Sequence, residues 1–269
     1  MRIGLFRSAF PILAAAITGG AAPASPARVI ASIDLMKPFA TRSHWRFIAT
    51  QGPDVQDPVE GPGDMEAGAI RLCISRDGGK SCGPDLERVM GATEPLFAVP
   101  HFLNSAGIVR PHGRALLLIE TSSVHSGDGD QIEATQILAY DRGGDRFVPA
   151  YGKMVGHNRN EEVRYMASGP LNGAMISAEP TGNAPYCYWI VVSRLGPAGT
   201  YRQVLRYRSA TRYDDGNSLA VIDSEMPNIE RRLGLWRPGT PLPLPKGRCP
   251  KPRLAGMELW CEPRRRDAS

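Results

Sequence analysis

The sequence predicts an all-β protein, built from repeated hairpin units that form either a propeller-like arrangement or a β-sandwich. Apolar residues alternate with a period of two far more often than with the helical period of about 3.6. The 269 residues include 29 glycines and 24 prolines, a content that predicts many turns. Apolar residues make up 42% of the chain and charged residues 22%. This composition supplies one sizeable core or two small ones, and it excludes a disordered chain and a bundle of membrane helices.

The first 24 residues have the pattern of a secretory signal peptide. Arg2 and Arg7 precede an apolar stretch from Ala9 to Ile17, and small residues follow as far as Ala24. The alternative, an N-terminal membrane anchor, needs about 20 continuous apolar residues, roughly twice the length of this stretch. We therefore expect cleavage after residue 24 and a periplasmic or secreted protein that does not span a membrane after cleavage.

The rest of the chain divides into a β-rich globular domain over residues 25–245 and a basic C-terminal tail over residues 246–269. Stretches that begin near Trp45, Arg114 and Gly173 look like variants of one repeated unit. Strands are expected over residues 45–50, 69–76, 114–121, 132–142, 146–151, 173–179, 186–194 and 201–208. Because three units are too few to close a propeller unless other segments supply more blades, a β-sandwich is the leading alternative.

One helix is expected near residues 224–233. Asp223 or Ser224 can cap its start, and Gly234 suits the position just after its end. Three apolar residues share one face of this helix: Met226, Ile229 and Leu233. The proline-rich run over residues 238–245 can be neither helix nor central strand, so we expect an extended segment there.

Five cysteines in an exported protein predict disulfides before they predict metal ligands. Cys73 and Cys82 flank an Asp-Gly-Gly turn, so their thiols are expected to face each other across a hairpin. Cys249 and Cys261 bracket a proline-rich loop, and a disulfide between them would pin the basic tail, which leaves Cys187 unpaired. Zinc is the competing interpretation, but the sequence has no Cys-x-x-Cys pattern and no nearby pair of histidines.

Familiar catalytic motifs do not point to a reaction. The sequence contains no Ser-x-x-Lys, no His-Glu-x-x-His and no dinucleotide-binding glycine pattern. Ser218 lies in a segment that resembles a nucleophile elbow. An elbow needs a strand before the serine and a helix after it, and residues 219–222 are expected to form a strand instead. Ser218 is therefore not expected to be a nucleophile.

Two polar clusters are candidate ligand-binding sites, one over residues 157–162 and one over residues 214–217. The candidate residues are His157, Asn158, Asn160, Glu161, Glu162, Asp214, Asp215 and Asn217. Their imidazole, amide and carboxylate groups can act as acids, bases or ligands, although a solvated loop and ordinary turn chemistry explain the same residues. Asp128 and Asp130 offer oxygen ligands of the kind calcium prefers, and no other cofactor is expected.

The formal net charge is +5, and arginines alternate with tyrosines over residues 201–213, as on some nucleic-acid-binding surfaces. In a strand, however, Tyr201 and Tyr207 would share one face while Arg202 and Arg206 share the other. That pattern is typical of a half-buried outer strand. We expect no nucleic-acid partner.

Four segments carry a resemblance to exported proteobacterial proteins of uncharacterised activity: residues 47–50, 73–82, 157–162 and 213–227. The resemblance extends from about Trp45 to Glu262. It implies the compartment, but no activity and no catalytic residues. The units are also loosely similar to propeller repeats, although the kelch and WD signatures are absent.

Two functions follow as hypotheses. The first is an all-β binding or accessory protein of the bacterial envelope, with a ligand surface formed by the loops over residues 157–162 and 214–217. Its partner would be a small molecule, a glycan or an envelope protein. The alternative is a hydrolase of envelope or extracellular glycans that uses Glu161, Glu162, Asp214 or Asp215 as acid and base. Two carboxylates about 5 to 10 Å apart in one cleft would favour the enzyme.

Overall fold

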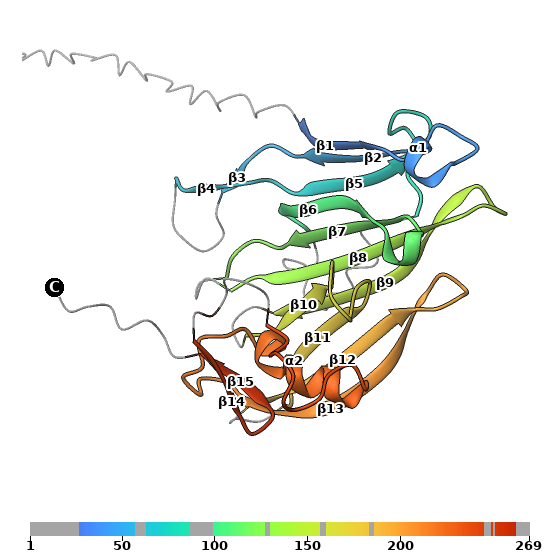
Figure 1. Ribbon diagram of the computed structural model, residues 1–269. Coiled ribbons are helices and arrows are strands. Elements are labelled where there is room, and N and C mark those ends of the chain that lie inside the picture. The colour runs from blue at the N-terminus through green and yellow to red at the C-terminus, as the bar shows by residue number, and fades with distance from the viewer. Residues whose placement is uncertain are drawn as a thin grey trace, which may run out of the picture.

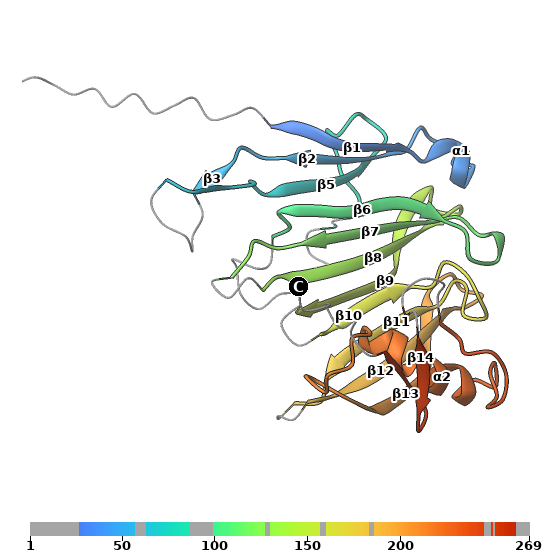
Figure 2. The ribbon, with the colours of Figure 1, turned by 60° about the vertical axis from the view of Figure 1, so that its left-hand side comes forward.

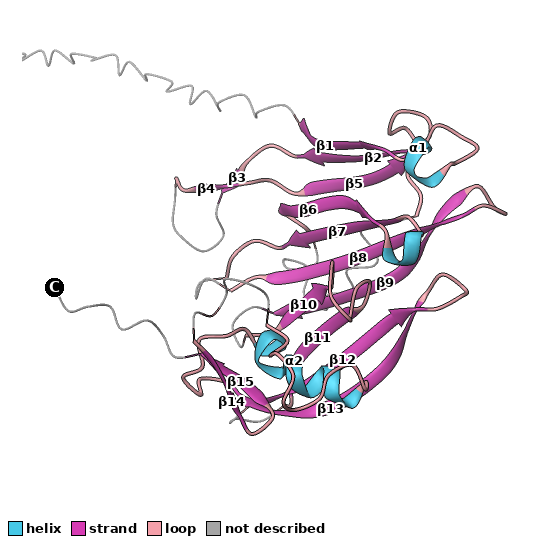
Figure 3. Cartoon of the chain, in the orientation of Figure 1, coloured by secondary structure: helices cyan, strands magenta, loops and turns pink. Residues whose placement is uncertain are grey.

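The protein is mostly β, as the sequence predicts. The computed structural model describes residues 27–56, 63–84, 86, 99–126, 130–156, 160–182, 186–244, 249 and 251–261. Strands account for 49% of the structure and helices for 9%, and the sheets are antiparallel (Figure 3). The expected signal peptide, residues 1–24, lies outside the described residues.

Three antiparallel sheets make up most of the fold (Figure 1). The first sheet contains β1 (Arg28–Asp34), β2 (Arg46–Gln51) and β5 (Ile70–Ser75). The second sheet contains β6 (Phe102–Val109), β7 (Leu116–Ser122), β8 (Ile132–Asp141) and β9 (Arg146–Gly156). The third sheet contains β10 (Glu162–Tyr165), β11 (Met175–Pro180), β12 (Cys187–Leu195) and β13 (Tyr201–Arg212). Within each sheet the strands lie side by side in chain order.

Smaller elements complete the structure. Two hairpins pair β3 (Val55–Gln56) with β4 (Met65–Glu66) and β14 (Pro252–Ala255) with β15 (Glu258–Cys261). The helical elements are α1 (Met36–Phe39), the 3-10 turn η3 (Pro111–Gly113) and α2 (Val221–Arg232).

The three sheets follow one another in a stack, with α2 and the β14–β15 hairpin at one end (Figures 1 and 2). Between the first and second sheets, Phe47 and Leu117 belong to one buried cluster. Between the second and third sheets, Leu116 and Met175 belong to another. Because successive residues of a strand point to opposite faces, β7 supplies both clusters from adjacent positions. The other face of the third sheet is covered by α2, whose Ile229 is fully buried.

The outermost strand of the third sheet has the alternation that the sequence predicts. Along β13, Tyr207 is buried while Arg206 and Arg208 are exposed. The guanidinium of Arg206 lies 4.1 Å from the ring centroid of Trp189 on the neighbouring strand. The arginine and tyrosine alternation thus reflects a half-buried edge strand.

The eight expected strands correspond to β2, β5, β7, β8, β9, β11, β12 and β13. The first strand of each large sheet, β1, β6 or β10, was not expected. The burial of β6 is nearly uniform along its length, and β10 has only four residues, so neither carries a clear alternation. A sequence repeat underlying the three sheets stays a prediction.

Helix α2 begins at Val221, three residues before the expected start at residue 224. The expected strand over residues 219–222 is wrong, because a short apolar run cannot by itself distinguish a strand from a buried helix turn. Asp223 and Ser224 lie in the first turn, and the N-cap is Ala220 rather than either of them. The end of the helix is as predicted: Gly234 has a φ of 71° just past the last turn.

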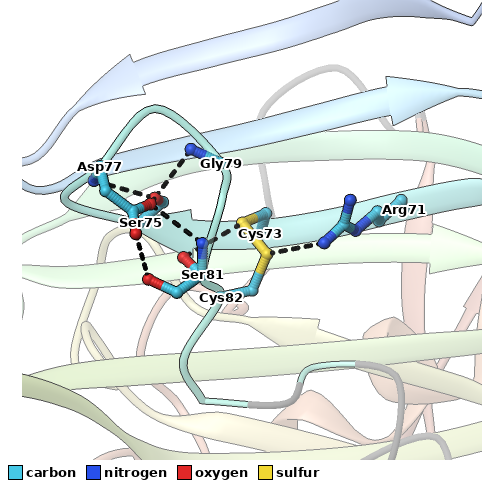
Figure 4. Close-up of a disulfide and its surroundings, with 7 residues drawn as sticks. All are labelled: Arg71, Cys73, Ser75, Asp77, Gly79, Ser81 and Cys82. Carbon is cyan, nitrogen blue, oxygen red and sulfur yellow. Dashed lines mark hydrogen bonds between the residues drawn. A yellow bond between two sulfur atoms is a disulfide. The ribbon is translucent and has the colours of Figure 1, made fainter.

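The predicted disulfide between Cys73 and Cys82 is present, with Cα atoms 4.9 Å apart (Figure 4). It closes a loop rather than the expected hairpin, because β5 ends at Ser75 and no strand follows it before Cys82. Asp77 organises this loop by accepting hydrogen bonds from the hydroxyls of Ser75 and Ser81. These bonds hold the pKa of the Asp77 carboxyl well below its usual range.

The second predicted disulfide joins Cys249 to Cys261, with Cα atoms 6.0 Å apart. The segment between them contains the β14–β15 hairpin rather than the expected loop, and β15 contacts α2 through the fully buried Leu259. Residues 251–261 of the predicted tail therefore pack as part of the fold. Cys187 is free, as predicted, and it is buried.

Candidate functional site

The first predicted cluster, residues 157–162, lies between β9 and β10. His157 and Asn158 lie outside the described residues. Asn160 has a φ of 54°, and its side chain hydrogen-bonds the phenol of Tyr188, which is fully buried. Burial is the main cause of the raised pKa of Tyr188, and the charges of Asp215 and Glu161 add to it. Residues of both predicted clusters thus surround one buried tyrosine.

Of the predicted calcium ligands, Asp128 lies outside the described residues and Asp130 lies two residues before β8. A Cβ atom at Gly156 would lie 3.5 Å from Oε1 of Glu161 and 3.9 Å from Oδ2 of Asp130, so the two carboxylates meet there. Both side chains have interaction partners. Within the described ranges, no group of three or more His, Cys, Asp or Glu side chains could hold a metal ion. Calcium binding stays a prediction.

Glu162 hydrogen-bonds the first turn of α2. One carboxylate oxygen accepts the Ile222 N–H at 2.5 Å, and the other accepts a hydrogen bond from Arg164 at 2.7 Å. Arg164 also donates to Asp223 at 2.5 Å. Because the N-cap residue Ala220 supplies no side-chain cap, Glu162 satisfies a backbone N–H of the first turn in its place. Burial raises the pKa of Glu162, and the adjacent Arg164 opposes this effect.

The second predicted cluster ties the β13–α2 connection to the C-terminal hairpin. Asp215 accepts the Asn217 N–H at 2.9 Å. The Asn217 amide donates to the Leu259 carbonyl at 2.8 Å and accepts the Cys261 N–H at 3.1 Å. Asp214 is exposed, with a φ of 59°. Two of the three predicted residues, Asp215 and Asn217, therefore hold the chain together.

Two serines, Ser218 and Ser81, lie in sequence contexts similar to that of a catalytic nucleophile, but their contacts do not support that role. Ser218 does precede a helix, contrary to the expectation, but its hydroxyl donates to the Cys261 carbonyl at 2.8 Å. Ser81 lies in Gly79-Lys80-Ser81-Cys82-Gly83, which has Gly-x-Ser-x-Gly spacing. Its hydroxyl donates to Asp77 within the disulfide loop. In the described part of the chain neither hydroxyl contacts a histidine, so neither serine has the base that a nucleophile requires.

A pair of carboxylates that the sequence did not single out lies between β13, α2 and β15. Glu225 is fully buried and accepts hydrogen bonds from the hydroxyls of Tyr207 and Thr211, each at 2.7 Å. Burial, reinforced by the charges of Glu225 and Asp215, raises the pKa of Glu258 to about 7. Glu225 has no exposed surface, so of this pair only the half-buried Glu258 reaches solvent.

A cleft of about 640 Å³ opens where loops of all three sheets meet. Its lining comes from α1, from the segment around η3, from the β8–β9 turn and from the β12–β13 turn. Three arginines line it: Arg110, Arg114 and Arg142. We call it the arginine cleft.

Two glycines allow the η3 segment to approach the third sheet. A Cβ atom at Gly173 would lie 2.5 Å from Cβ of Pro111, and one at Gly199 would lie 2.3 Å from a guanidinium nitrogen of Arg114. Both glycines have positive φ values, 82° and 83°. The turn is closed by the Arg114 N–H, which donates to the Pro111 carbonyl at 3.0 Å and leaves Arg110 at its other end. Arg114 is therefore held over the β12–β13 turn.

The arginine cleft carries excess positive charge. Arg110, Arg114 and Arg142 are exposed, and none forms a side-chain hydrogen bond or ion pair with another described residue. The acidic residue in the lining is Asp141, which accepts backbone N–H groups of its own turn and lies 3.4 Å from Nε of Arg146. The Gly144 and Gly143 N–H groups are the first causes of its lowered pKa. Three unpaired guanidinium groups suit an anion.

The sequence alone indicates only part of the arginine cleft. Arg142 stands at the end of a predicted strand, immediately before a glycine turn, as Arg76 and Arg194 also do. Arg110 and Arg114 flank the Pro-His-Gly segment of η3, and nothing in the sequence alone brings that segment to the β8–β9 turn.

Comparison with protein families, curated proteins and solved structures finds no match for this chain. Along the described stretches, no helix combines the length and apolar character needed to cross a membrane. The function is therefore argued from the geometry of the arginine cleft.

Proposed function

We propose that the protein is an exported binding protein of the bacterial envelope and that the arginine cleft binds an anionic ligand. The observation that carries the proposal is the set of three guanidinium groups that line one cleft without a described partner. Guanidinium forks bind phosphate and carboxylate groups through paired hydrogen bonds, which is the recognition that such a cleft offers.

Export rests on the pattern of residues 1–24 and on the disulfides. The pairs Cys73–Cys82 and Cys249–Cys261 are compatible with a periplasmic or extracellular location, because disulfides persist in oxidising compartments.

Binding is favoured over glycan hydrolysis because two of the four candidate catalytic carboxylates hold the fold together and none of the four lines the arginine cleft. Glu162 holds the start of α2 and Asp215 holds a loop. A hydrolase would have to rely on Asp130 and Glu161, which meet beside Gly156, but they do not line the arginine cleft. Among the described residues, Asp141 is the one carboxylate that lines the arginine cleft, so this cleft does not supply the acid and base pair of a glycosidase.

The test is calorimetric titration of the mature chain with glucose 6-phosphate and, separately, with glucose. We expect the phosphorylated sugar to bind more tightly than the neutral one. Arg114→Gln and Arg142→Gln should each weaken binding about fivefold, since an exposed charge-assisted contact contributes about 1 kcal/mol. Arg46→Gln is the matched control, because Arg46 is exposed on β2 and does not line the cleft. Equal binding of the two sugars, or equal loss in the control, would overturn the proposal.

A further inference from the structure

A second concave site lies against α2 and shares no lining residue with the arginine cleft. It has a volume of about 380 Å³, within the range of small-molecule sites. Its walls come from the β10–β11 connection, from α2 and from the segment after α2. Apolar side chains dominate them: Met166, Leu171, Met226, Leu235, Trp236, Leu242 and Leu244. We call it the Trp236 pocket.

The chain after α2 is folded back to form one wall. The helix ends with the Leu235 N–H donating to the Glu230 carbonyl at 2.8 Å, a bond that reverses the chain direction. Trp236 is buried, and its indole N–H donates to the Pro241 carbonyl at 3.0 Å. This bond closes the turn over residues 237–240 and fixes the proline-rich run beside α2. The pocket is therefore held open by a hydrogen-bonded frame.

One charged group belongs to the wall of this pocket, the carboxyl of Glu230. Glu230 is only 5% exposed, and no described side chain or backbone N–H donates to it. The neighbouring guanidinium groups do not neutralise it, because Arg231 and Arg232 both donate to the amide oxygen of Asn228. Burial raises the pKa of Glu230.

An unpartnered carboxyl in an apolar wall disfavours the folded state, because its charge loses water and gains no partner. The same position, however, gives the pocket a negative charge at a site whose other walls accept hydrocarbon. A ligand with an apolar body and one cationic donor would satisfy both parts of the wall at once.

We propose that the Trp236 pocket binds a small apolar molecule that carries one protonated amine, with Glu230 as the group that pairs with the ammonium. The apolar body lies against Trp236, Met226 and Leu171, where its burial supplies most of the affinity. The ammonium donates to the Glu230 carboxylate, which supplies the preference for a cation. This site is separate from the arginine cleft, and its ligand has the opposite charge.

The test uses three probes that share one apolar body and differ in charge: 2-phenylethylamine, 2-phenylethanol and 3-phenylpropanoate. Titration of the unaltered mature chain, followed by calorimetry or by NMR shifts of the Trp236 indole N–H, should give the amine at least tenfold higher affinity than the alcohol. The carboxylate probe should bind weakest. Equal affinities for amine and alcohol, or no binding of any probe, would overturn the proposal, and this comparison depends on no variant.

Glu230→Gln then tests the role of the carboxylate. The substitution keeps the shape of the side chain and removes the charge, so the amine should lose its tenfold advantage while the alcohol binds as before. Glu258→Gln is the matched control, because Glu258 is a half-buried glutamate near α2 that does not line the pocket. A Glu230→Gln protein that still prefers the amine would refute the assignment. Glucose 6-phosphate binding should be unchanged in both variants, so failure here is distinguishable from failure of the proposed function.

Discussion

Replacing Glu258 by Gln should change how the stability of the protein depends on pH. In the folded protein the pKa of Glu258 is raised from 4.5 to about 7, first by burial and then by the charges of Glu225 and Asp215. The folded state therefore holds a proton that the unfolded state releases at lower pH. The free energy of unfolding should fall as the pH rises from about 4.5 through about 7. Glutamine cannot ionise, so the variant should lack this contribution.

The size of the effect follows from the two pKa values. A difference of about 2.5 pKa units corresponds to about 3.4 kcal/mol, at about 1.36 kcal/mol per unit. Glu258 is only partly buried, and solvent screening reduces this figure to about 1 to 2 kcal/mol. Above about pH 8 the variant should exceed the unaltered protein in stability by that amount, and near pH 4 the two should be equal.

The assay is urea unfolding followed by circular dichroism at a series of pH values, with the disulfides intact. Asp64→Asn is the control, because Asp64 is an exposed carboxylate just before β4. If the stability curves of the Glu258→Gln variant and the unaltered protein run parallel over the whole pH range, the carboxyl does not titrate abnormally and the reasoning is wrong.

Four further perturbations have defined outcomes. Gly199→Ala should displace the Arg114 guanidinium, which a Cβ atom would approach to 2.3 Å, and calorimetry should show weaker glucose 6-phosphate binding; unchanged affinity would remove Arg114 from the site. Affinity of the unaltered protein for glucose 6-phosphate should also fall as salt is added, and a salt-independent affinity would argue against guanidinium contacts. Trp236→Phe removes one buried hydrogen bond and should lower the free energy of unfolding by about 0.5 to 1.5 kcal/mol in urea titrations. The variant should also lose 2-phenylethylamine binding. If stability and binding are both retained, the hydrogen bond from Trp236 to Pro241 is not needed to form the pocket. Joint replacement of Cys249 and Cys261 by Ser should cost about 3 kcal/mol in the same titrations, on the loop-entropy account, and an unaltered midpoint would mean that the hairpin holds without its disulfide.

Much of the fold was predictable because it depends on local pattern. The alternation along residues 201–208 predicts the half-buried β13, and Gly234 marks the end of α2. The disulfide pairs followed from cysteine spacing. The start of α2 was not predictable in this way, because Glu162 on β10 accepts the Ile222 N–H from sixty positions along the chain. Local sequence offers no sign of a partner at that distance.

The candidate sites were harder to predict than the fold. Polar clusters such as residues 214–217 are easily recognised in the sequence. In the structure, however, the side chain of Asn217 hydrogen-bonds the backbone of Leu259 and Cys261. The arginine cleft, by contrast, is formed by turns that belong to different sheets. The sequence of each turn, taken alone, does not indicate a binding site. Glu230 looks like an ordinary helix residue followed by two arginines until its burial is known. Site chemistry here depends on tertiary proximity, which a single sequence does not encode in any one segment.

The arginine cleft draws its walls from loops of all three sheets, from Phe39 between β1 and β2 to Gly199 between β12 and β13. It exists only while the whole stack is assembled. A bound anion would accordingly act as a clamp across the molecule, adding about 2.7 kcal/mol to global stability when present at a hundred times its dissociation constant. Local opening of any one sheet would release the ligand. Adding the ligand should then raise the protease resistance of all three sheets together.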